Sequence, residues 1–172
     1  MKALFIIAPA RYQDFEYNVP KKIFELAGIE VITASKTKGS IKGALGGTTQ
    51  AQLSLSEVKV KDYDLILFVG GPGAVEYQQD EEAHKIAQEA VIRNKILAAI
   101  CIAPIILASA GVLFGKKATV WNDDGLEEDI LKENGATYTG EKVTVDGKII
   151  TANGPRAAEE FAKRILERLV KK

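Results

Sequence analysis

The stretch KILAAICIAPIILASAG, residues 95–111, decides the fold of this chain. Its first part, Ile96 to Ile100, is short, continuous and apolar, which is typical of a parallel-sheet strand buried on both faces. Residues 102–110 then favour a helix, because Pro104 falls in the first turn, where a missing N–H costs nothing, and a glycine ends the stretch. The pattern predicts a sharp strand-to-helix turn at Cys101.

Cys101 is the only cysteine of the chain. A sharp turn after a strand exposes one side chain at the strand's carboxyl end and directs the free N–H groups of the next helix at it. Helix N-termini favour negative charge, so this position is expected to lower the pKa of the thiol and to favour a thiolate. The alternative is an inert, buried residue, since free cysteines are among the most buried residues in proteins. The local stretch leaves both interpretations open.

The composition fits a single domain of 172 residues with a substantial core. Lys and Arg together number 23, as do Asp and Glu, and the resulting net charge of zero gives no reason to expect a nucleic-acid or anionic-membrane partner. No apolar run approaches the roughly 18 residues of a membrane-spanning helix, and the N-terminal run is too short for a signal peptide. One cysteine excludes an intramolecular disulfide, so we expect a cytoplasmic protein.

Alternating apolar segments predict a doubly wound α/β domain with a mainly parallel sheet. Two hairpins are expected, one within 36–55 and one formed by 142–145 and 148–151 around the two-residue turn signal Asp146-Gly147. Lys171 and Lys172 suit the negative end of the last helix. The other strands are expected at 3–8, 29–34, 62–69 and 118–121, and the other helices at 17–27, 81–94, 126–133 and 156–170.

Three loops should meet at the carboxyl edge of this sheet, where such folds bind ligands. They carry Glu16, the glycines of 70–73 and Cys101. Glycines after a buried strand let the backbone approach a ligand and present N–H groups to an oxyanion, although a tight turn without a ligand is the plainer explanation. Glu16 is expected to satisfy free N–H groups in the first helical turn. Its functional alternative is a carboxyl that faces Cys101 and stays protonated because burial raises its pKa.

Further candidates for lining a pocket come from two loops. Trp121 and Asn122 follow a predicted strand, with core filling and a turn as the alternative roles. Arg11 and Tyr12 lie in the loop after the first strand, where solvated residues are the alternative.

His84 is the only histidine, and we predict that it lies on the outward part of its helix. One histidine excludes a His-rich metal site, and Cys101 has no second thiol with which to hold a metal. We therefore expect no metal and no cofactor.

Four segments together carry a resemblance to a known family: DFEYNVP (14–20), DLILFVGGPGA (64–74), AAICIAPIILASAG (98–111) and KVTVDGKIITANGP (142–155). Over essentially its whole length, the chain resembles the PfpI-type branch of the class I glutamine-amidotransferase-like superfamily, which also holds the Parkinsonism-associated deglycase. The resemblance implies a flavodoxin-like three-layer sandwich, with residues 1–172 as one domain, a nucleophile elbow at Cys101 and small β-hairpins. It also implies a homodimer or higher homo-oligomer.

The resemblance implies roles for individual residues. Cys101 matches the family's reactive cysteine, and Glu16 matches the glutamate that contacts it. Gly71 and the backbone N–H of Ile102 match the oxyanion-hole donors, with Gly70 beside them as a further candidate for lining the pocket. Family activities include glyoxalase or deglycase action on methylglyoxal-type dicarbonyls, redox sensing, chaperone-like protection and reported intracellular proteolysis. The implied partner is a small aldehyde or dicarbonyl substrate.

The chain departs from the family in its histidines. PfpI-type peptidases usually carry a histidine directly after the cysteine, where this chain has Ile102, and the deglycase branch usually carries one after the next strand, about where Trp121 falls. Loss of that imidazole should lower a peptidase rate roughly 10²–10⁴-fold. We therefore expect a cysteine-centred stress or detoxification role of the glyoxalase type. The alternatives are a redox sensor or chaperone-like protein and, less favoured, a cysteine peptidase.

Overall fold

The computed structural model describes residues 1–170, so Lys171 and Lys172 and their expected role at the helix end lie outside the described residues. The strands are β1 (Lys2–Ile6), β2 (Glu30–Ser35), β3 (Gly39–Lys42), β4 (Thr48–Ala51), β5 (Leu53–Ser54), β6 (Leu65–Phe68), β7 (Ile96–Ile100), β8 (Lys117–Ala118), β9 (Thr137–Tyr138), β10 (Val143–Asp146) and β11 (Ile149–Ala152). The α-helices are α1 (Asp14–Leu26), α2 (Glu81–Ile92), α3 (Pro104–Ser109), α4 (Leu126–Glu133) and α5 (Ala158–Val170). Short 3₁₀ helices lie at Leu55–Glu57, Val60–Asp62, Pro72–Tyr77 and Pro155–Ala157.

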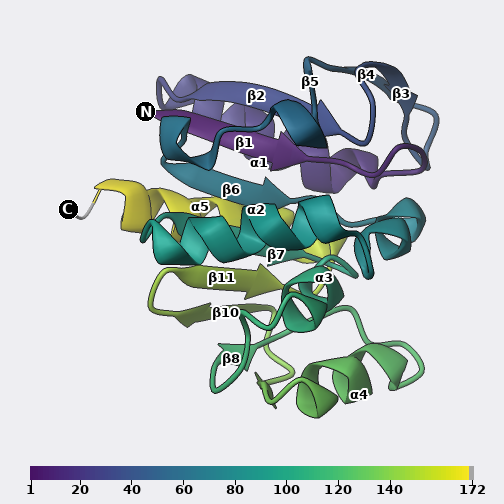
Figure 1. The fold of residues 1–172 in the computed structure, drawn as a ribbon, viewed down its shortest axis with the longest axis vertical. Coiled ribbons are helices and arrows are strands. Elements are labelled where there is room, and N and C mark those ends of the chain that lie inside the picture. The colour runs from purple at the N-terminus through teal and green to yellow at the C-terminus, as the bar shows by residue number, and fades with distance from the viewer. Residues whose placement is uncertain (171–172) are drawn as a thin grey trace.

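Seven strands form the central sheet in the order β10-β11-β7-β6-β1-β2-β5 (Figure 1). All neighbours in it are parallel except β10 and β11, which form an antiparallel hairpin at one edge. The predicted strand over 96–100 is confirmed residue for residue as β7, and it lies in the middle of the sheet with every residue buried.

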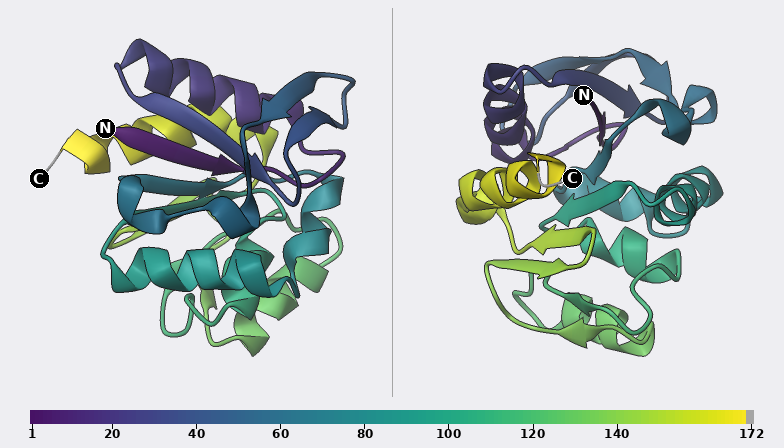
Figure 2. Two further views of the ribbon diagram at one scale, coloured as in Figure 1. Left: turned by 45° about the horizontal axis from the view of Figure 1, so that its top comes forward. Right: turned by 90° about the vertical axis from the view of Figure 1, so that its left-hand side faces the viewer.

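Helices cover both faces of this sheet, with α1 and α5 on one face and α2 and α3 on the other (Figure 2). Successive strand residues therefore point into different apolar layers. In β1, Leu4 and Ile6 pack in the layer below α2 and α3, while Phe5 packs in the layer of α1 and α5. Phe5 meets Phe24 of α1 edge-on, with the ring centroids 5.8 Å apart. The doubly wound, flavodoxin-like three-layer sandwich predicted from the sequence is confirmed.

The loops that follow β1, β6 and β7 meet at the carboxyl edge of the sheet, as parallel strands require. Backbone hydrogen bonds join the first two loops, because Gln13 N–H donates to the Gly70 carbonyl at 2.9 Å and Gly73 N–H donates to the Arg11 carbonyl at 3.2 Å. The helix after β1 begins at Asp14, three residues earlier than predicted. Glu16 is consequently held within the first turn of α1.

Both predicted hairpins are present, as β3–β4 and β10–β11. Since Asp146 pairs with Ile149, the second turn lies at residues 147–148, one residue later than expected. The loop between β3 and β4 is bound to α1, because the buried carboxylate of Asp14 accepts hydrogen bonds from Leu45 N–H at 2.8 Å and Gly47 N–H at 2.7 Å.

The strand predicted over 118–121 is wrong for most of its length. β8 ends at Ala118 and pairs with β9 in a small separate sheet. Beyond it, Thr119 N–H donates to the Thr151 hydroxyl and Trp121 N–H donates to the Cys101 carbonyl. These backbone groups are therefore not available for pairing with a neighbouring strand. Among residues 1–170, no helix is long and apolar enough to cross a membrane.

Candidate active site

Cys101 lies directly after β7 in the left-handed backbone region, with φ at 64°. For a residue with a side chain this conformation costs about 1–3 kcal/mol, and it persists only where neighbours fix it. Here Cys101 N–H donates to the Ala152 carbonyl, and the Cys101 carbonyl accepts from Trp121 N–H, both at 2.8 Å. The neighbouring β11 and the segment after β8 therefore hold the strained turn on both sides.

Glu16 and Cys101 meet over Gly70. A Cβ atom on Gly70 would lie 2.5 Å from Glu16 Oε2, 2.5 Å from Cys101 Cβ and 2.5 Å from the Ile100 carbonyl oxygen. The carboxyl and the cysteine thus occupy the space that a side chain at position 70 would need. Glycine at position 70 is therefore required for the contact between them.

The Glu16 side chain is completely buried, and within residues 1–170 the Cys101 thiol and the Gly70 N–H lie beside its carboxyl oxygens without reaching good hydrogen-bonding geometry. A charged carboxylate in such a place would be very unfavourable. Burial raises the pKa of Glu16 to about 8, and the Cys101 thiol and the Gly70 N–H offset only part of this rise. Glu16 is therefore a protonated acid at neutral pH, as the functional alternative for this residue requires.

The thiol of Cys101 differs from the expected thiolate. Burial, followed by the charge of Glu16 when that group is ionised, raises the pKa of Cys101. The backbone N–H groups of Gly71 and Ile102 face the sulfur and lower the pKa, but by less. The free helix N-terminus expected beside the thiol is displaced, because α3 begins only at Pro104 and a turn precedes it. The buried pair thus carries no more than one negative charge at neutral pH.

Gly71 presents its N–H through a backbone that only glycine adopts readily, with φ at 107°. A Cβ atom at this position would lie 2.4 Å from Gln13 N and 2.7 Å from the Arg11 carbonyl oxygen. The loops after β1 and β6 are thus packed backbone to backbone. Together with the N–H of Ile102, Gly71 supplies two donors for an oxygen atom held beside the sulfur.

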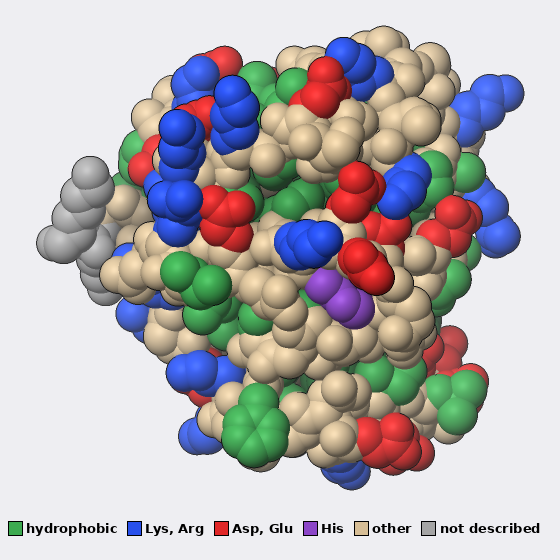
Figure 3. All heavy atoms as spheres, in the orientation of Figure 1, with side chains coloured by type: hydrophobic (Ala, Val, Ile, Leu, Met, Phe, Trp, Pro, Cys, Tyr) green, Lys and Arg blue, Asp and Glu red, His purple; other side chains and the backbone are tan. Residues whose placement is uncertain are grey.

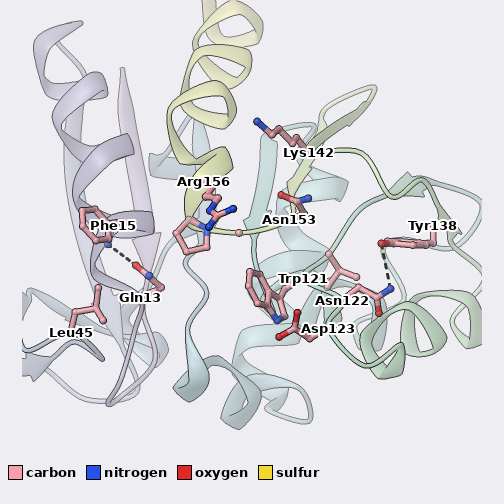
Figure 4. Close-up of a pocket in the computed structure, with 13 residues that line it drawn as sticks. Gln13, Phe15, Leu45, Trp121, Asn122, Asp123, Tyr138, Lys142, Asn153 and Arg156 are labelled. Carbon is pink, nitrogen blue, oxygen red and sulfur yellow. Dashed lines mark hydrogen bonds between the residues drawn. The ribbon is translucent and has the colours of Figure 1, made fainter.

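A cavity of about 270 Å³ opens at Cys101. A larger cavity of about 700 Å³, drawn in Figure 4, shares Gln13, Trp121 and Pro155 with it. The smaller cavity is lined by Gln13, Gly71, Pro72, Cys101, Ile102, Trp121 and Pro155. Although Cys101 is only 6% exposed, it therefore borders an open space and is not sealed in the core.

Comparison with known proteins shows the family of this chain. The model of the DJ-1/PfpI family matches residues 1–168. The chain belongs to the DJ-1/PfpI family. The resemblance seen in the sequence is thus confirmed.

The names of relatives in the DJ-1/PfpI family state different activities. Deglycase PfpI of Pyrococcus furiosus is 33% identical over 155 residues, which cover 90% of this chain and 91% of the relative. A glutathione-independent glyoxalase of Caenorhabditis elegans is 26% identical, with 97% and 88% covered. The crystal structure of a ThiJ/PfpI domain protein from Brachyspira murdochii superposes with a TM-score of 0.94 at 33% identity, with 98% and 95% covered.

Not every predicted pocket residue of this DJ-1/PfpI protein lies where it was expected. Trp121 lines both cavities and Asn122 lines the larger one, whereas Gly70 lies beneath Glu16 and Cys101. Tyr12 lines none of the cavities described: it is 1% exposed and packs edge-on against Tyr17. The expectation for Tyr12 is wrong because its backbone pairs with Gly43 and its side chain is buried.

Gln13 and Pro155 line both cavities and were missed in the sequence. Gln13 is the N-cap of α1, and its side-chain oxygen accepts from Phe15 N–H at 2.6 Å. Glutamine is an unusual N-cap residue, so no local pattern marked this position. Pro155 follows Gly154 after β11, within the family segment 142–155, and that segment was its only indication.

The only histidine of the chain lies elsewhere. His84 is on α2, and its Nε2 lies 2.7 Å from the Gln78 carbonyl oxygen. It lines none of the described cavities, and the surface view shows it on the α2 face among charged side chains (Figure 3). Within residues 1–170, no three His, Cys, Asp or Glu side chains lie close enough to hold a metal ion.

Proposed function

We propose that this protein is a detoxifying enzyme of the glyoxalase or deglycase type that acts on small α-dicarbonyls through Cys101. The observation that carries the proposal is the buried, protonated Glu16 held against Cys101 at the end of a cavity. The names of the relatives, a deglycase and a glyoxalase among them, support the same chemistry.

The first step is addition of sulfur to the aldehyde carbon of a substrate such as methylglyoxal. The reactive form of the pair is the one in which Glu16 keeps its proton and the single negative charge lies on Cys101. The thiolate forms a C–S bond, and the electron pair of the C=O bond moves to oxygen. The N–H groups of Gly71 and Ile102 stabilise this alkoxide, and Glu16 gives it a proton, which leaves a neutral hemithioacetal.

The second step moves a proton between adjacent carbons. Glu16, now a carboxylate, takes the proton from the former aldehyde carbon and returns one to the former ketone carbon. The hydroxyl proton of the hemithioacetal passes to the former ketone oxygen at the same time, so the first carbon is oxidised to a thioester, the second is reduced to an alcohol, and no external oxidant is needed. Water then hydrolyses the thioester, which releases a 2-hydroxy acid and restores the thiol. A pKa near 8 suits Glu16 to both roles because it lies near the working pH.

A redox-sensing role is a second candidate, since a protonated Glu16 could donate a hydrogen bond to an oxidised sulfur. In that reaction peroxide oxidises the thiolate to sulfenate and is itself reduced to water. The raised pKa of Cys101 lowers the fraction of thiolate, on which this oxidation and the proposed addition to a dicarbonyl both depend. Mass spectrometry after peroxide titration tests it: oxygen addition at Cys101 in step with low peroxide doses supports sensing, and an inert thiol excludes it.

A cysteine peptidase is disfavoured. Such an enzyme needs an imidazole to activate the thiol and to protonate the leaving amine. His84, on α2, is bonded to the Gln78 carbonyl before that helix and lines neither cavity near Cys101.

Product analysis tests the proposed enzyme. Purified protein is incubated with methylglyoxal, and the 2-hydroxy acid is measured by proton NMR beside a matched Cys101→Ser variant. We expect the acid to accumulate with the native protein and its rate of formation to fall at least about 100-fold with Cys101→Ser. If the native protein forms no 2-hydroxy acid, the proposal is wrong.

A further inference from the structure

The space beside Cys101 is much larger than a small dicarbonyl requires. The cavity of about 270 Å³ at the sulfur adjoins a cavity of about 700 Å³, and the two share Gln13, Trp121 and Pro155 in their linings. Together they reach the size of pockets that hold drug-sized ligands, about 300–1,000 Å³. The pocket at Cys101 therefore has an outer extension, which we call the outer cavity and which Figure 4 shows.

Trp121 stands between the two cavities and lines both. Its ring packs on Gly154, where a Cβ atom would lie 2.8 Å from the indole Cε3. Gly154 has no side chain and a backbone φ of 147°, so the indole packs directly against its backbone. Pro155 and Arg156 are the next two residues of the chain. The same turn thus fixes the partition between the cavities and brings a cation to the outer one.

The outer cavity carries two cations without counter-ions. Lys142 and Arg156 both line it, and among residues 1–170 neither side chain forms an ion pair. In Figure 4 they project from the segments on either side of Asn153, whose backbone N–H donates to the Lys142 carbonyl at 3.0 Å. Asp123, on the lower wall in this view, is the one acid of the lining. The lining therefore has an excess of positive charge.

Unpaired cations beside aromatic and carboxamide groups suit a ligand that carries a carboxylate. A guanidinium matches the two oxygens of a carboxylate, and Trp121 and Tyr138 add aromatic surface to the same lining, against which a carbon chain can pack.

We propose that the outer cavity is a subsite for a carboxylate on the substrate, with Lys142 and Arg156 as its binding residues. The inference rests on the proposed function for the place of the reacting carbonyl at Cys101. It adds that the preferred substrate is a dicarbonyl whose far end is a carboxylate, and that methylglyoxal fills only the inner cavity.

Binding is tested first, on a Cys101→Ala variant in which no turnover occurs. Trp121 is the only tryptophan of the chain, so its fluorescence reports on binding in either of the two cavities that it lines, and the variants at Lys142 and Arg156 assign the signal to the outer one. The probes are phenylacetate and its neutral isostere phenylacetamide. We expect phenylacetate to bind more tightly, and Arg156→Gln or Lys142→Gln to weaken it about 3- to 10-fold while phenylacetamide changes less than about twofold.

Two controls define the site. Arg164→Gln, on the exposed side of α5 where the native residue pairs with Glu167, should leave both affinities unchanged. Asp123→Asn should strengthen phenylacetate binding, because it removes the acid that repels the probe. Equal affinity for the two probes, or loss of phenylacetate affinity in Arg164→Gln to the same extent as in Arg156→Gln, would overturn the subsite.

Turnover is tested second, with 4,5-dioxopentanoate and 2-oxopentanal, which share the reacting dicarbonyl and differ in the terminal carboxylate. We expect the charged substrate to have the lower KM in the native protein and to lose that advantage in Arg156→Gln with little change in kcat. Absence of turnover with both substrates would reject the proposed function and leave the binding result standing. Turnover of both with equal KM would reject the carboxylate preference and leave the proposed function standing.

Discussion

Oε2 of Glu16 and Cβ of Cys101 lie on the same side of Gly70, each 2.5 Å from the point that a side-chain carbon would occupy there. Glu16 belongs to the first turn of α1 and Cys101 to the turn after β7. A buried acid without a hydrogen-bond partner and a strained cysteine are both costly. Their coincidence at one glycine is the basis of the catalytic interpretation.

Glu16→Gln should remove a pH dependence of stability. The folded-state pKa of Glu16 is about 8 against an ordinary 4.5, so between these values the folded protein binds a proton that the unfolded chain has released. Stability contributed by this proton is fully present below about pH 4.5 and is lost as the pH rises to about 8. Melting temperatures measured across this range should fall in the native protein and fall less in Glu16→Gln. If the melting temperatures of the two proteins changed with pH in parallel, the pKa of Glu16 would not be raised in the folded protein, and Glu16 would be ionised there.

Gly70→Ala should separate the acid from the cysteine. The new methyl group would overlap Glu16 and Cys101, which should cost about 1–3 kcal/mol and abolish activity. Gly111→Ala is the control: that position has φ at 78° and open space around it, so it should lose about 1–2 kcal/mol of stability and keep full activity. Denaturant unfolding and methylglyoxal consumption measure both effects. An active Gly70→Ala protein would refute the close contact.

The buried strands and the turn at Cys101 were predictable because continuous apolar runs and a lone Pro-containing helix start are local signals. The contact between Glu16 and Cys101 was only one of two roles weighed for Glu16, since which groups surround a first-turn acid depends on the loop after β6. Tyr12 was misplaced because its bridge to Gly43 is a tertiary contact. The strand assigned to 118–121 failed because the Thr151 hydroxyl, and not a strand backbone, meets Thr119.

His84→Gln should leave activity unchanged within about twofold, because the imidazole of this α2 residue bonds the Gln78 carbonyl just before the helix and lines neither cavity. The loss of that hydrogen bond should cost no more than about 1.5 kcal/mol. Initial rates with methylglyoxal, compared after normalising for folded protein, provide the measurement. A tenfold loss of rate would restore the possibility of a Cys–His enzyme.

Asp14→Ala should loosen the loop between β3 and β4. Leu45 and Gly47 N–H groups would lose their acceptor, which should cost about 1–3 kcal/mol. Because the loop would lose these two hydrogen bonds, limited proteolysis should cut within residues 43–47 faster than in the native protein. Leu45 of this loop also lines the outer cavity. Asp14→Asn keeps one oxygen acceptor and should show an intermediate effect. Unchanged cleavage in Asp14→Ala would show that the loop is held by other contacts.

The most direct test of the account is a double-mutant cycle on methylglyoxal turnover. If Cys101 and Glu16 act as one unit, Cys101→Ser and Glu16→Gln should each lower kcat/KM at least about 100-fold, and the double variant should be no slower than the slower single variant. Independent effects that multiply in the double variant, or full turnover by Cys101→Ser, would contradict a reaction carried by this pair.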